Sequence, residues 1–335
     1  MKLTDEQLRG LTNASQLYEV WRDLLVQRSQ LPGGMYWRVI NSKEYLYQYV
    51  STAGIQQTKS LGPKTSEAID TYDEFQKTKK DLDDRIGGVE NRLKEFAPAW
   101  RGLRLPAIDR TAGAILRAFD QVNFVGKSVL VVGTYALKAY EVEAAAAFAT
   151  GMDSTEDLDF TLFVNEDAAD TDLPRRLLLT LKQVDATFIV NLASSKTVIN
   201  KNGYKVDLLA SKSVADKVSP ARPWKPEILD GQEWLTLGRP VTAVVIDFDG
   251  WPVALAAPDP RYFALHKIWL SKRPTRSNIK RTKDKRQGEA LLRAVRDYMP
   301  HYPLDEEFVV ALPRPLKEQY DAFLNESAKA PSHPA

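Results

Sequence analysis

The chain has 335 residues, of which 44% are hydrophobic and 27% charged, a composition typical of a soluble globular protein with room for about two domains. It contains no cysteine, which excludes disulfides, thiolate zinc sites and cysteine nucleophiles. The formal net charge is +2, and no apolar run approaches the ~18 residues that a transmembrane helix needs. Residues 1–21 are polar and amphipathic, unlike a signal peptide, so we expect a cytosolic protein with no membrane partner.

The first hundred residues predict an N-terminal domain, residues 1–100. A helix is expected from Thr4, the N-cap, to about Gln27. Aromatic and β-branched residues alternate over 35–40 and 45–50, which predicts an antiparallel hairpin. Apolar residues at heptad-like spacing over 65–96 predict a long exposed helix or a helical hairpin, with a break at Gly87-Gly88.

A linker between Pro98 and Pro106 leads into an α+β segment, residues 105–257. We expect helices over 107–122, 135–148 and 173–181, and strands over 128–132, 157–164, 197–200, 204–209, 241–248 and 251–256. Asn202-Gly203 and Asp249-Gly250 predict hairpin turns between the last two pairs of strands. The segment 258–328 is predicted to be a helical C-terminal domain, and 329–335 a disordered tail.

Gly133-Thr134 lies where a buried strand passes into a helix. Glycine lets the backbone approach a ligand closely, and the start of a helix offers free N–H groups to an anion. Thr134 can cap the helix and touch a phosphate. Taken alone, the dipeptide is better explained as a tight turn with a threonine cap.

The strand Asp157-Leu158-Asp159-Phe160 places two carboxylates on one face, because alternate residues of a strand share a face. Two close carboxylates repel one another unless a cation lies between them, and Mg²⁺ prefers such oxygen ligands. An exposed face with two solvated acids is the alternative.

Asp207 is a third acidic residue on the polar face of a predicted strand. If that strand lies beside the Asp157 strand, three carboxylates converge and can hold two metal ions, unless Asp207 is merely exposed. The three histidines are too scattered in the sequence to suggest a metal cluster, and we expect no catalytic role for His266, His301 or His333.

The Gly-Thr turn, the following helix, the Thr-x-Asp-x-Asp strand and the later single Asp together resemble the polymerase-beta-like nucleotidyltransferase superfamily. The resemblance implies a nucleotidyltransferase fold, a triphosphate held at Gly133 and Thr134, and two Mg²⁺ ions bound by Asp157, Asp159 and Asp207, with the three acids forming the catalytic set. The insert between the turn and the acids is longer than in minimal members of that superfamily.

A narrower likeness runs from about Tyr36 to Leu292. The runs 133–141, 154–160 and 258–267 resemble a bacterial nucleotidyltransferase-like family, and the layout is similar to that of toxin nucleotidyltransferases that modify transfer RNA. By analogy alone, the acceptor is a tRNA or another RNA.

Residues 267–286 contain nine Lys or Arg and one acid, a net charge of +8. We expect Lys267 and Arg273 to bind nucleotide phosphates and the whole stretch Lys267–Arg286 to bind an RNA acceptor. A solvated basic helix is the alternative explanation.

The expected activity is Mg²⁺-dependent transfer of a nucleoside monophosphate from an NTP to an acceptor hydroxyl, with release of pyrophosphate. The alternative is a non-catalytic nucleotide- or RNA-binding protein that keeps the fold, for instance an antitoxin or regulatory partner. Trp234, Trp251 and Trp269 are expected to be core or interface residues and not stacking platforms for bases.

Overall fold

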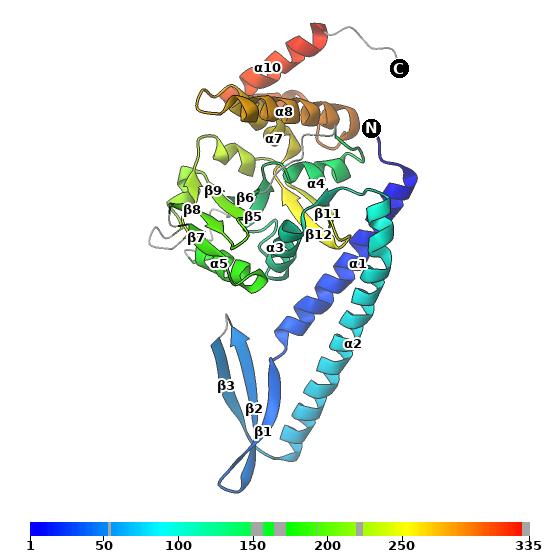
Figure 1. Ribbon diagram of the computed structural model, residues 1–335, viewed down its shortest axis with the longest axis vertical. Helices are drawn as coiled ribbons and strands as arrows, with labels where there is room; N and C mark the ends of the chain where they lie inside the picture. The colour runs from blue at the N-terminus through cyan, green and yellow to red at the C-terminus, as the bar shows by residue number, and fades with distance from the viewer. Residues whose placement is uncertain (53–54, 149–156, 164–171, 192, 219–223, 330–335) are drawn as a thin grey trace. The chain divides into compact units, whose positions relative to one another are not determined.

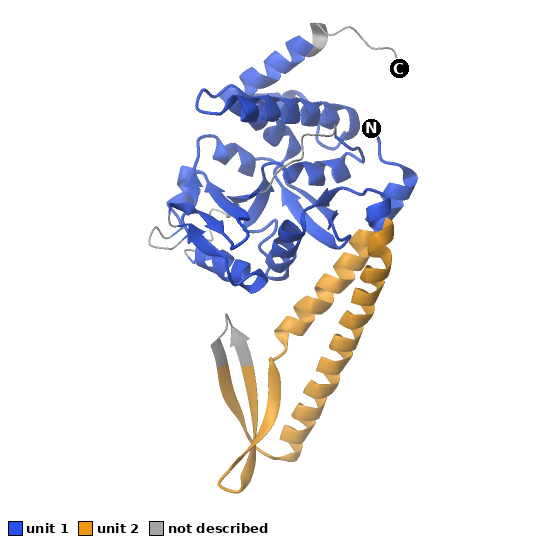
Figure 2. Cartoon of the chain, in the orientation of Figure 1, with its two compact units in different colours: residues 1–12, 100–335 blue, residues 13–99 orange. Residues whose placement is uncertain are grey.

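The computed structural model describes residues 1–52, 55–148, 157–163, 172–191, 193–218 and 224–329 (Figure 1). The chain divides into two compact units (Figure 2). Unit 1 comprises residues 1–12 and 100–335, and unit 2 comprises residues 13–99. The segments 105–257 and 258–328, which the sequence analysis separates, both lie in unit 1.

Unit 2 contains a three-stranded antiparallel sheet in the order β1-β2-β3 and the greater part of the two helices α1 and α2. Its elements are β1 Gly34–Ile40, β2 Lys43–Thr52 and β3 Ile55–Pro63, together with most of α1 Asp5–Gln30 and α2 Ser66–Gly102. Asn41 and Ser42, the two residues between β1 and β2, both have positive φ angles, 50° and 62°. Positive φ at both central positions is the mark of a tight hairpin turn, so the predicted hairpin is present.

Two expectations for the long helix are wrong, because α2 is continuous from Ser66 to Gly102. Gly87-Gly88 does not break it: a Cβ at either glycine would meet no atom within 4 Å, so the pair lies at an open part of the helix surface. Near this glycine pair, α2 contacts α1, for example through an ion pair of 2.7 Å between Arg28 of α1 and Asp83 of α2. Pro98 lies inside the helix and not in a linker, since tertiary contacts outweigh the local cost of proline.

Unit 1 is built on two sheets. The larger sheet has the order β5-β6-β9-β8-β7, with β10 beside β9, and the smaller has the order β12-β11-β4. The strands are β4 Ala107–Ile108, β5 Val129–Val132, β6 Asp157–Leu162, β7 Ile189–Asn191, β8 Ser194–Ile199, β9 Lys205–Ala210, β10 Glu227–Ile228, β11 Val241–Asp247 and β12 Pro252–Ala257. Both predicted hairpins, β8–β9 and β11–β12, are antiparallel pairs as expected.

The helices of unit 1 pack on these sheets around one continuous apolar core. They are α3 Arg110–Gln121, α4 Ala136–Glu143, α5 Leu173–Val184, α6 Lys212–Ala215, the 3₁₀ helix η1 Gln232–Thr236, α7 Pro260–Ser271, α8 Asn278–Tyr298, α9 Glu306–Ala311 and α10 Arg314–Lys329. Phe119 of α3 stacks on Phe160 of β6 with ring centroids 5.2 Å apart. The fold is therefore α+β, as the sequence predicts.

The helix expected over 135–148 is shorter, since α4 ends at Glu143. Ala145 has a φ of 48°, which a right-handed helix does not accommodate, and Ala146 forms a β-bridge with Lys2. Pairing with the N-terminal residues thus replaces the last turn of the expected helix.

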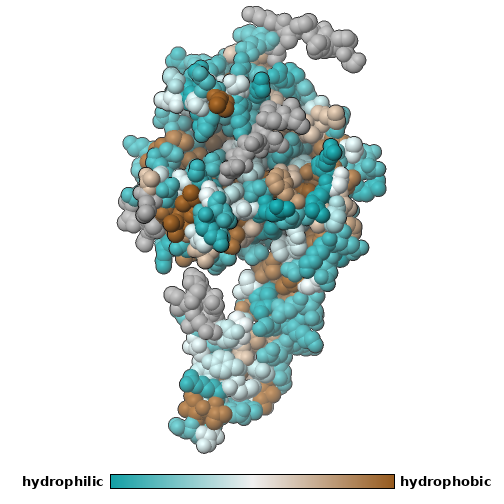
Figure 3. All heavy atoms as spheres, viewed as in Figure 1, coloured by the Kyte–Doolittle hydropathy of each residue, from teal (hydrophilic) through white to brown (hydrophobic). Residues whose placement is uncertain are grey.

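The exposed surface mixes polar and apolar residues. On the face drawn in Figure 3, hydrophilic residues cover most of the surface and hydrophobic residues form small scattered groups. None of the helices in the described ranges is both long enough and apolar enough to span a membrane. The expected disordered tail lies outside the described residues from 330 onward.

Candidate active site

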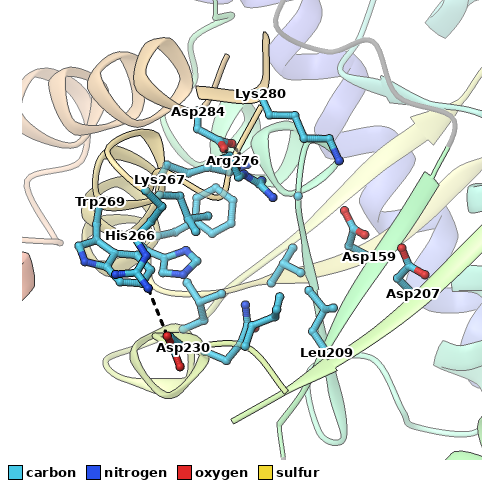
Figure 4. A pocket seen from close by; sticks show the side chains of 18 of the residues that line it. Asp159, Asp207, Leu209, Asp230, His266, Lys267, Trp269, Arg276, Lys280 and Asp284 are labelled. Atoms are coloured by element: carbon cyan, nitrogen blue, oxygen red, sulfur yellow. Dashed lines mark hydrogen bonds and ion pairs between the residues drawn. The ribbon is translucent and has the colours of Figure 1, made fainter. Parts of the chain in front are cut away.

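One cavity of about 450 Å³ in unit 1 brings the predicted site residues together. Seven of its lining residues were singled out from the sequence: Gly133, Thr134, Asp157, Asp159, Asp207, Lys267 and Arg273. Figure 4 shows Asp159 and Asp207 across the cavity from Lys267, Trp269 and Arg276. Strand residues thus form an acidic wall, and α7 and α8 form a basic one.

The acidic wall follows from the register of the larger sheet. Strands β6 and β9 pair in parallel, with Asp159 directly opposite Asp207. Side chains of directly paired residues point to the same face, so the two carboxylates lie side by side. Thr197 of β8 is the next residue along this row and donates a hydrogen bond of 2.6 Å from Oγ1 to Asp207 Oδ1. The pairing that the sequence analysis required for convergence of the acids is therefore present.

Gly133 is required at its position on two counts. Its φ angle is 70°, in the left-handed region that favours glycine. A Cβ at this position would overlap Asp159 Oδ2, so any side chain there would displace that carboxylate. The position of the Asp159 carboxylate thus depends on the absence of a side chain at Gly133.

Thr134 lies in the cavity wall but does not cap the helix, so the N-cap expectation is wrong. Helix α4 has Tyr135 at its N-cap, in helical conformation, and no side chain accepts a capping hydrogen bond there. Thr134 is 8% exposed, and its carbonyl oxygen accepts a hydrogen bond from the Leu137 N–H. The helix therefore begins one residue later than predicted.

A polar network holds this turn in place. Asp109 is the N-cap of α3: its Oδ1 accepts hydrogen bonds from the backbone N–H groups of Thr111 and Ala112, at 2.7 and 2.9 Å. Its Oδ2 accepts from the hydroxyls of Tyr135 and Tyr204, the latter at 2.9 Å. Burial and the nearby Asp109 carboxylate raise the pKa of both tyrosines, which keeps their hydroxyls as donors. One carboxylate therefore ties the Gly133 turn to α3 and to the β8–β9 turn.

The neighbouring carboxylates of Asp159 and Asp207 destabilise one another when no cation is bound. Burial, followed by the nearby Asp207, raises the pKa of Asp159 to about 6. Burial and the charge of Asp157 also raise the pKa of Asp207, against the hydrogen bond from Thr197. A cation stabilises the ionised form of crowded, partly buried carboxylates of this kind.

The acids of the cavity do not form a closed metal cage, but Asp159 and Asp207 could supply part of the ligands of a metal ion. Among the residues that the structure describes, no three His, Cys, Asp or Glu side chains are grouped closely enough to hold a metal ion by themselves. Mg²⁺ commonly uses one or two carboxylates and takes its remaining ligands from water and substrate phosphates. The Asp159–Asp207 pair matches that arrangement, and Asp157 lines the same cavity.

The basic wall is organised by a buried ion-pair network. Asp284 accepts hydrogen bonds from Lys267 Nζ at 2.9 Å and from Arg276 Nε at 2.8 Å. Although burial raises the pKa of Asp284, the two cations hold it below its usual value. Gly288 permits this contact by bringing α8 close to α7, since a Cβ there would lie 2.6 Å from the Ala264 carbonyl oxygen. Lys267, expected to bind phosphate, therefore lines the cavity with its charge already paired.

Arg273 and Lys280 add further positive charge to the wall. Arg273 lies over the Trp269 ring, 4.8 Å from its centre, and donates a hydrogen bond of 3.3 Å to Asp230. Lys280 lines the cavity and lowers the pKa of Asp159 by its charge, as Lys267 also does. A phosphate chain next to the carboxylates would thus face at least two cationic side chains.

Several lining residues were not found from the sequence. Besides Glu227 and Asp230, they include Gln232 of η1 and both His266 and Trp269 of α7, although Trp269 was expected to be core or interface. The only sequence signal was proximity: His266 precedes Lys267 within the run 258–267. Gln232 carries no such signal, because it reaches the cavity through tertiary packing.

Comparison with known families agrees with this geometry. A family described as Nucleotidyltransferase matches residues 110–312, more than half of the chain. The chain belongs to this nucleotidyltransferase family. The match spans both walls of the cavity, from α3 to α9.

Among solved structures, the chain is similar to an antigenic nucleotidyltransferase-like protein from Paracoccidioides brasiliensis. The two share 16% sequence identity, and the alignment covers 65% of this chain and 88% of the other with a TM-score of 0.37. No curated protein matches the chain.

Proposed function

We propose that the protein transfers a nucleoside monophosphate from an NTP to an acceptor hydroxyl and releases pyrophosphate. The observation that carries this proposal is the position of Asp159, opposite Asp207 and beneath the side-chain-free Gly133, in a cavity with cations on the other wall. Within a nucleotidyltransferase family, this arrangement supports binding of a triphosphate between the two walls.

Each wall has a distinct task in the proposed reaction. Lys280 and Arg273 attract and orient the triphosphate, and Lys267 contributes a positive field fixed by Asp284. Asp207, with Thr197 holding its Oδ1, is placed to orient the acceptor hydroxyl and accept its proton. The attacking oxygen forms a bond to the α-phosphorus while the bond to the bridging oxygen of pyrophosphate breaks.

Asp157, Asp159 and Asp207 are the residues that would hold Mg²⁺. The ions, two by the superfamily resemblance, would neutralise charge on the α-phosphate and the pyrophosphate leaving group. Burial and Asp207 raise the pKa of Asp159, so the ionised form of this carboxyl is destabilised in the protein alone. A bound cation would offset that cost, because it stabilises the ionised carboxylate, and this supports the proposed role.

We further propose that the acceptor is an RNA. Lys272, Lys285 and Arg286 are exposed, and the last two line a second cavity on α8 together with Arg281. Lys267 and Arg276 are paired with the buried Asp284, whereas the pair of Lys285 with Glu289, at 3.5 Å, is exposed on the side of the lysine, so these exposed residues supply the charge for a polynucleotide. Transfer RNA is the first acceptor to test, by the likeness in layout to toxin nucleotidyltransferases.

The test is incubation of the purified protein with Mg²⁺ and each NTP labelled at the α-phosphate, with tRNA, total RNA or protein extract as acceptor. Label in RNA that disappears with Asp159→Asn supports the whole proposal. Label in protein alone would retain nucleotidyl transfer and refute the RNA acceptor. Failure of all four NTPs to label any fraction would favour a non-catalytic binding protein.

A further inference from the structure

The cavity has two chemically different ends. The carboxylates of Asp159 and Asp207 lie with Gly133 at one, whereas Leu229, Leu235 and Trp269 add apolar surface at the other, beside the ion pair of Arg273 with Asp230. A triphosphate gains nothing from contact with apolar side chains. A nucleobase does, because the faces of its flat ring are apolar and its edge is polar.

Two buried polar side chains at this apolar end have unused hydrogen-bonding atoms. His266 is 3% exposed, and neither of its ring nitrogens has a hydrogen-bond partner among the described residues. Gln232 is also 3% exposed, and its Oε1 has no partner among them either. Both residues line the cavity. Buried polar atoms are nearly always paired in folded proteins, so these two side chains point to a ligand edge.

Aromatic packing holds both side chains in place. The His266 ring lies nearly parallel to Trp269, with centroids 5.8 Å apart, and meets the edge of Trp234 at 6.2 Å. Gly231 has a φ of 82°, and a Cβ there would lie 3.0 Å from Trp234 and 3.2 Å from Trp269. This glycine brings η1, and with it Gln232, against the aromatic cluster. Burial, and then the charge of Lys267, lowers the pKa of His266 to about 3, so the imidazole is neutral and offers one donor and one acceptor.

We infer that the apolar end of the cavity binds the nucleobase of the NTP, and that His266 and Gln232 determine base specificity by hydrogen-bonding its edge. The inference rests on the proposed function, since it assigns the base of the same nucleotide whose phosphates face the carboxylates. Gln232 Oε1 accepts from an exocyclic amine or ring N–H of the base, and His266 pairs with a neighbouring acceptor or donor. Leu229 and Leu235 pack against the ring.

The experiment measures binding of the four NTPs and of inorganic tripolyphosphate, which has no base, by calorimetry with Mg²⁺ and without acceptor. His266→Phe keeps a ring of similar size, and Gln232→Met keeps the chain length, but both delete the hydrogen-bonding atoms. Each is expected to weaken binding of the preferred NTP by about ten-fold and to narrow the differences among the four NTPs. Binding of tripolyphosphate is expected to be unchanged.

Two matched controls separate base recognition from a general effect. His301→Phe changes a histidine that is paired with Glu143 outside the cavity, and Gln319→Met removes a buried, equally unpaired Oε1 on α10. Both should leave nucleotide binding unchanged. Thermal denaturation of each variant verifies folding, and if His266→Phe does not fold, Gln232→Met still decides the question.

Unchanged NTP affinity in a folded Gln232→Met and His266→Phe pair would overturn the inference and leave the proposed function standing. Equal weakening of NTP and tripolyphosphate would also overturn it, because the residues would then shape the cavity without contacting the base. A wild-type protein that binds no NTP would instead refute the proposed function itself.

Discussion

The raised pKa of Asp159 predicts that Asp159→Asn stabilises the protein in the absence of metal, by an amount that grows as the pH rises from about 4 and levels off above about 6. Burial and the neighbouring Asp207 raise the pKa of Asp159 from 3.8 to about 6 in the folded protein. Ionising this carboxyl is therefore harder in the folded than in the unfolded state, and its contribution to stability is lost as the pH rises through 6. A shift of about two pKa units corresponds to about 3 kcal/mol.

The assay is guanidinium unfolding of wild type and Asp159→Asn between pH 4 and 8 in EDTA. At pH 8 the variant should exceed the wild type by up to about 3 kcal/mol in free energy of unfolding, and below pH 4 the two should converge. Saturating Mg²⁺ should reduce the difference at pH 8, because a bound cation stabilises the wild type alone. Asp216→Asn, at an exposed aspartate, is the control and should show no such pH dependence.

A difference between wild type and Asp159→Asn that is the same at pH 4 and pH 8 would refute the reasoning. So would a variant that is less stable than wild type at pH 8 without metal. Either result would mean that the Asp159 carboxylate has a compensating partner in the folded protein and is not poised for a cation.

Four further predictions follow from the site. Gly133→Ala should lower nucleotidyl transfer by about 100-fold in a turnover assay, because its Cβ displaces the Asp159 carboxylate; near-normal turnover would contradict the close approach. Asp109→Ala should lower the free energy of unfolding by about 3 kcal/mol, since α3 loses its cap and two tyrosine hydroxyls lose their acceptor; a loss under about 1 kcal/mol in denaturant titration would disprove the network. Asp284→Asn should cost about 3 kcal/mol in the same titration by leaving Lys267 and Arg276 without their shared carboxylate, and an unchanged midpoint would show that the ion pairs are dispensable. Charge reversal at Lys272, Lys285 and Arg286 together should weaken RNA binding while sparing NTP binding, and the logarithm of wild-type RNA affinity should fall with log salt by about 0.7 per phosphate contact; salt-independent binding would exclude this RNA surface.

The acidic wall of the cavity was predictable because it depends on local patterns. An Asp-x-Asp strand places both acids on one face whatever surrounds it, whereas the Gly-Thr dipeptide suggested a site only in combination with these acids. The sequence also placed both hairpins correctly through Asn202-Gly203 and Asp249-Gly250, since such turns depend on the dipeptide itself.

Features that depend on distant contacts were not predictable in the same way. Gly87-Gly88 and Pro98 have low helix propensity, yet α2 is continuous because contacts along its length outweigh a local preference. Gln232 and His266 are separated by 33 intervening residues in the sequence and share the cavity lining only through the packing of η1 against α7. Their unused hydrogen-bonding atoms are a property of burial, which a single sequence does not report.

The most direct measurement of the proposed activity is the stoichiometry of a single reaction that contains NTP, Mg²⁺ and the labelled acceptor fraction. We expect one pyrophosphate to be released for each nucleoside monophosphate incorporated, with label from the α-phosphate retained in the acceptor and label from the γ-phosphate found only in pyrophosphate. Both signals should vanish with Asp159→Asn. Transfer of the γ-phosphate, or release of pyrophosphate with no nucleotide incorporated, would contradict nucleotidyl transfer at this site.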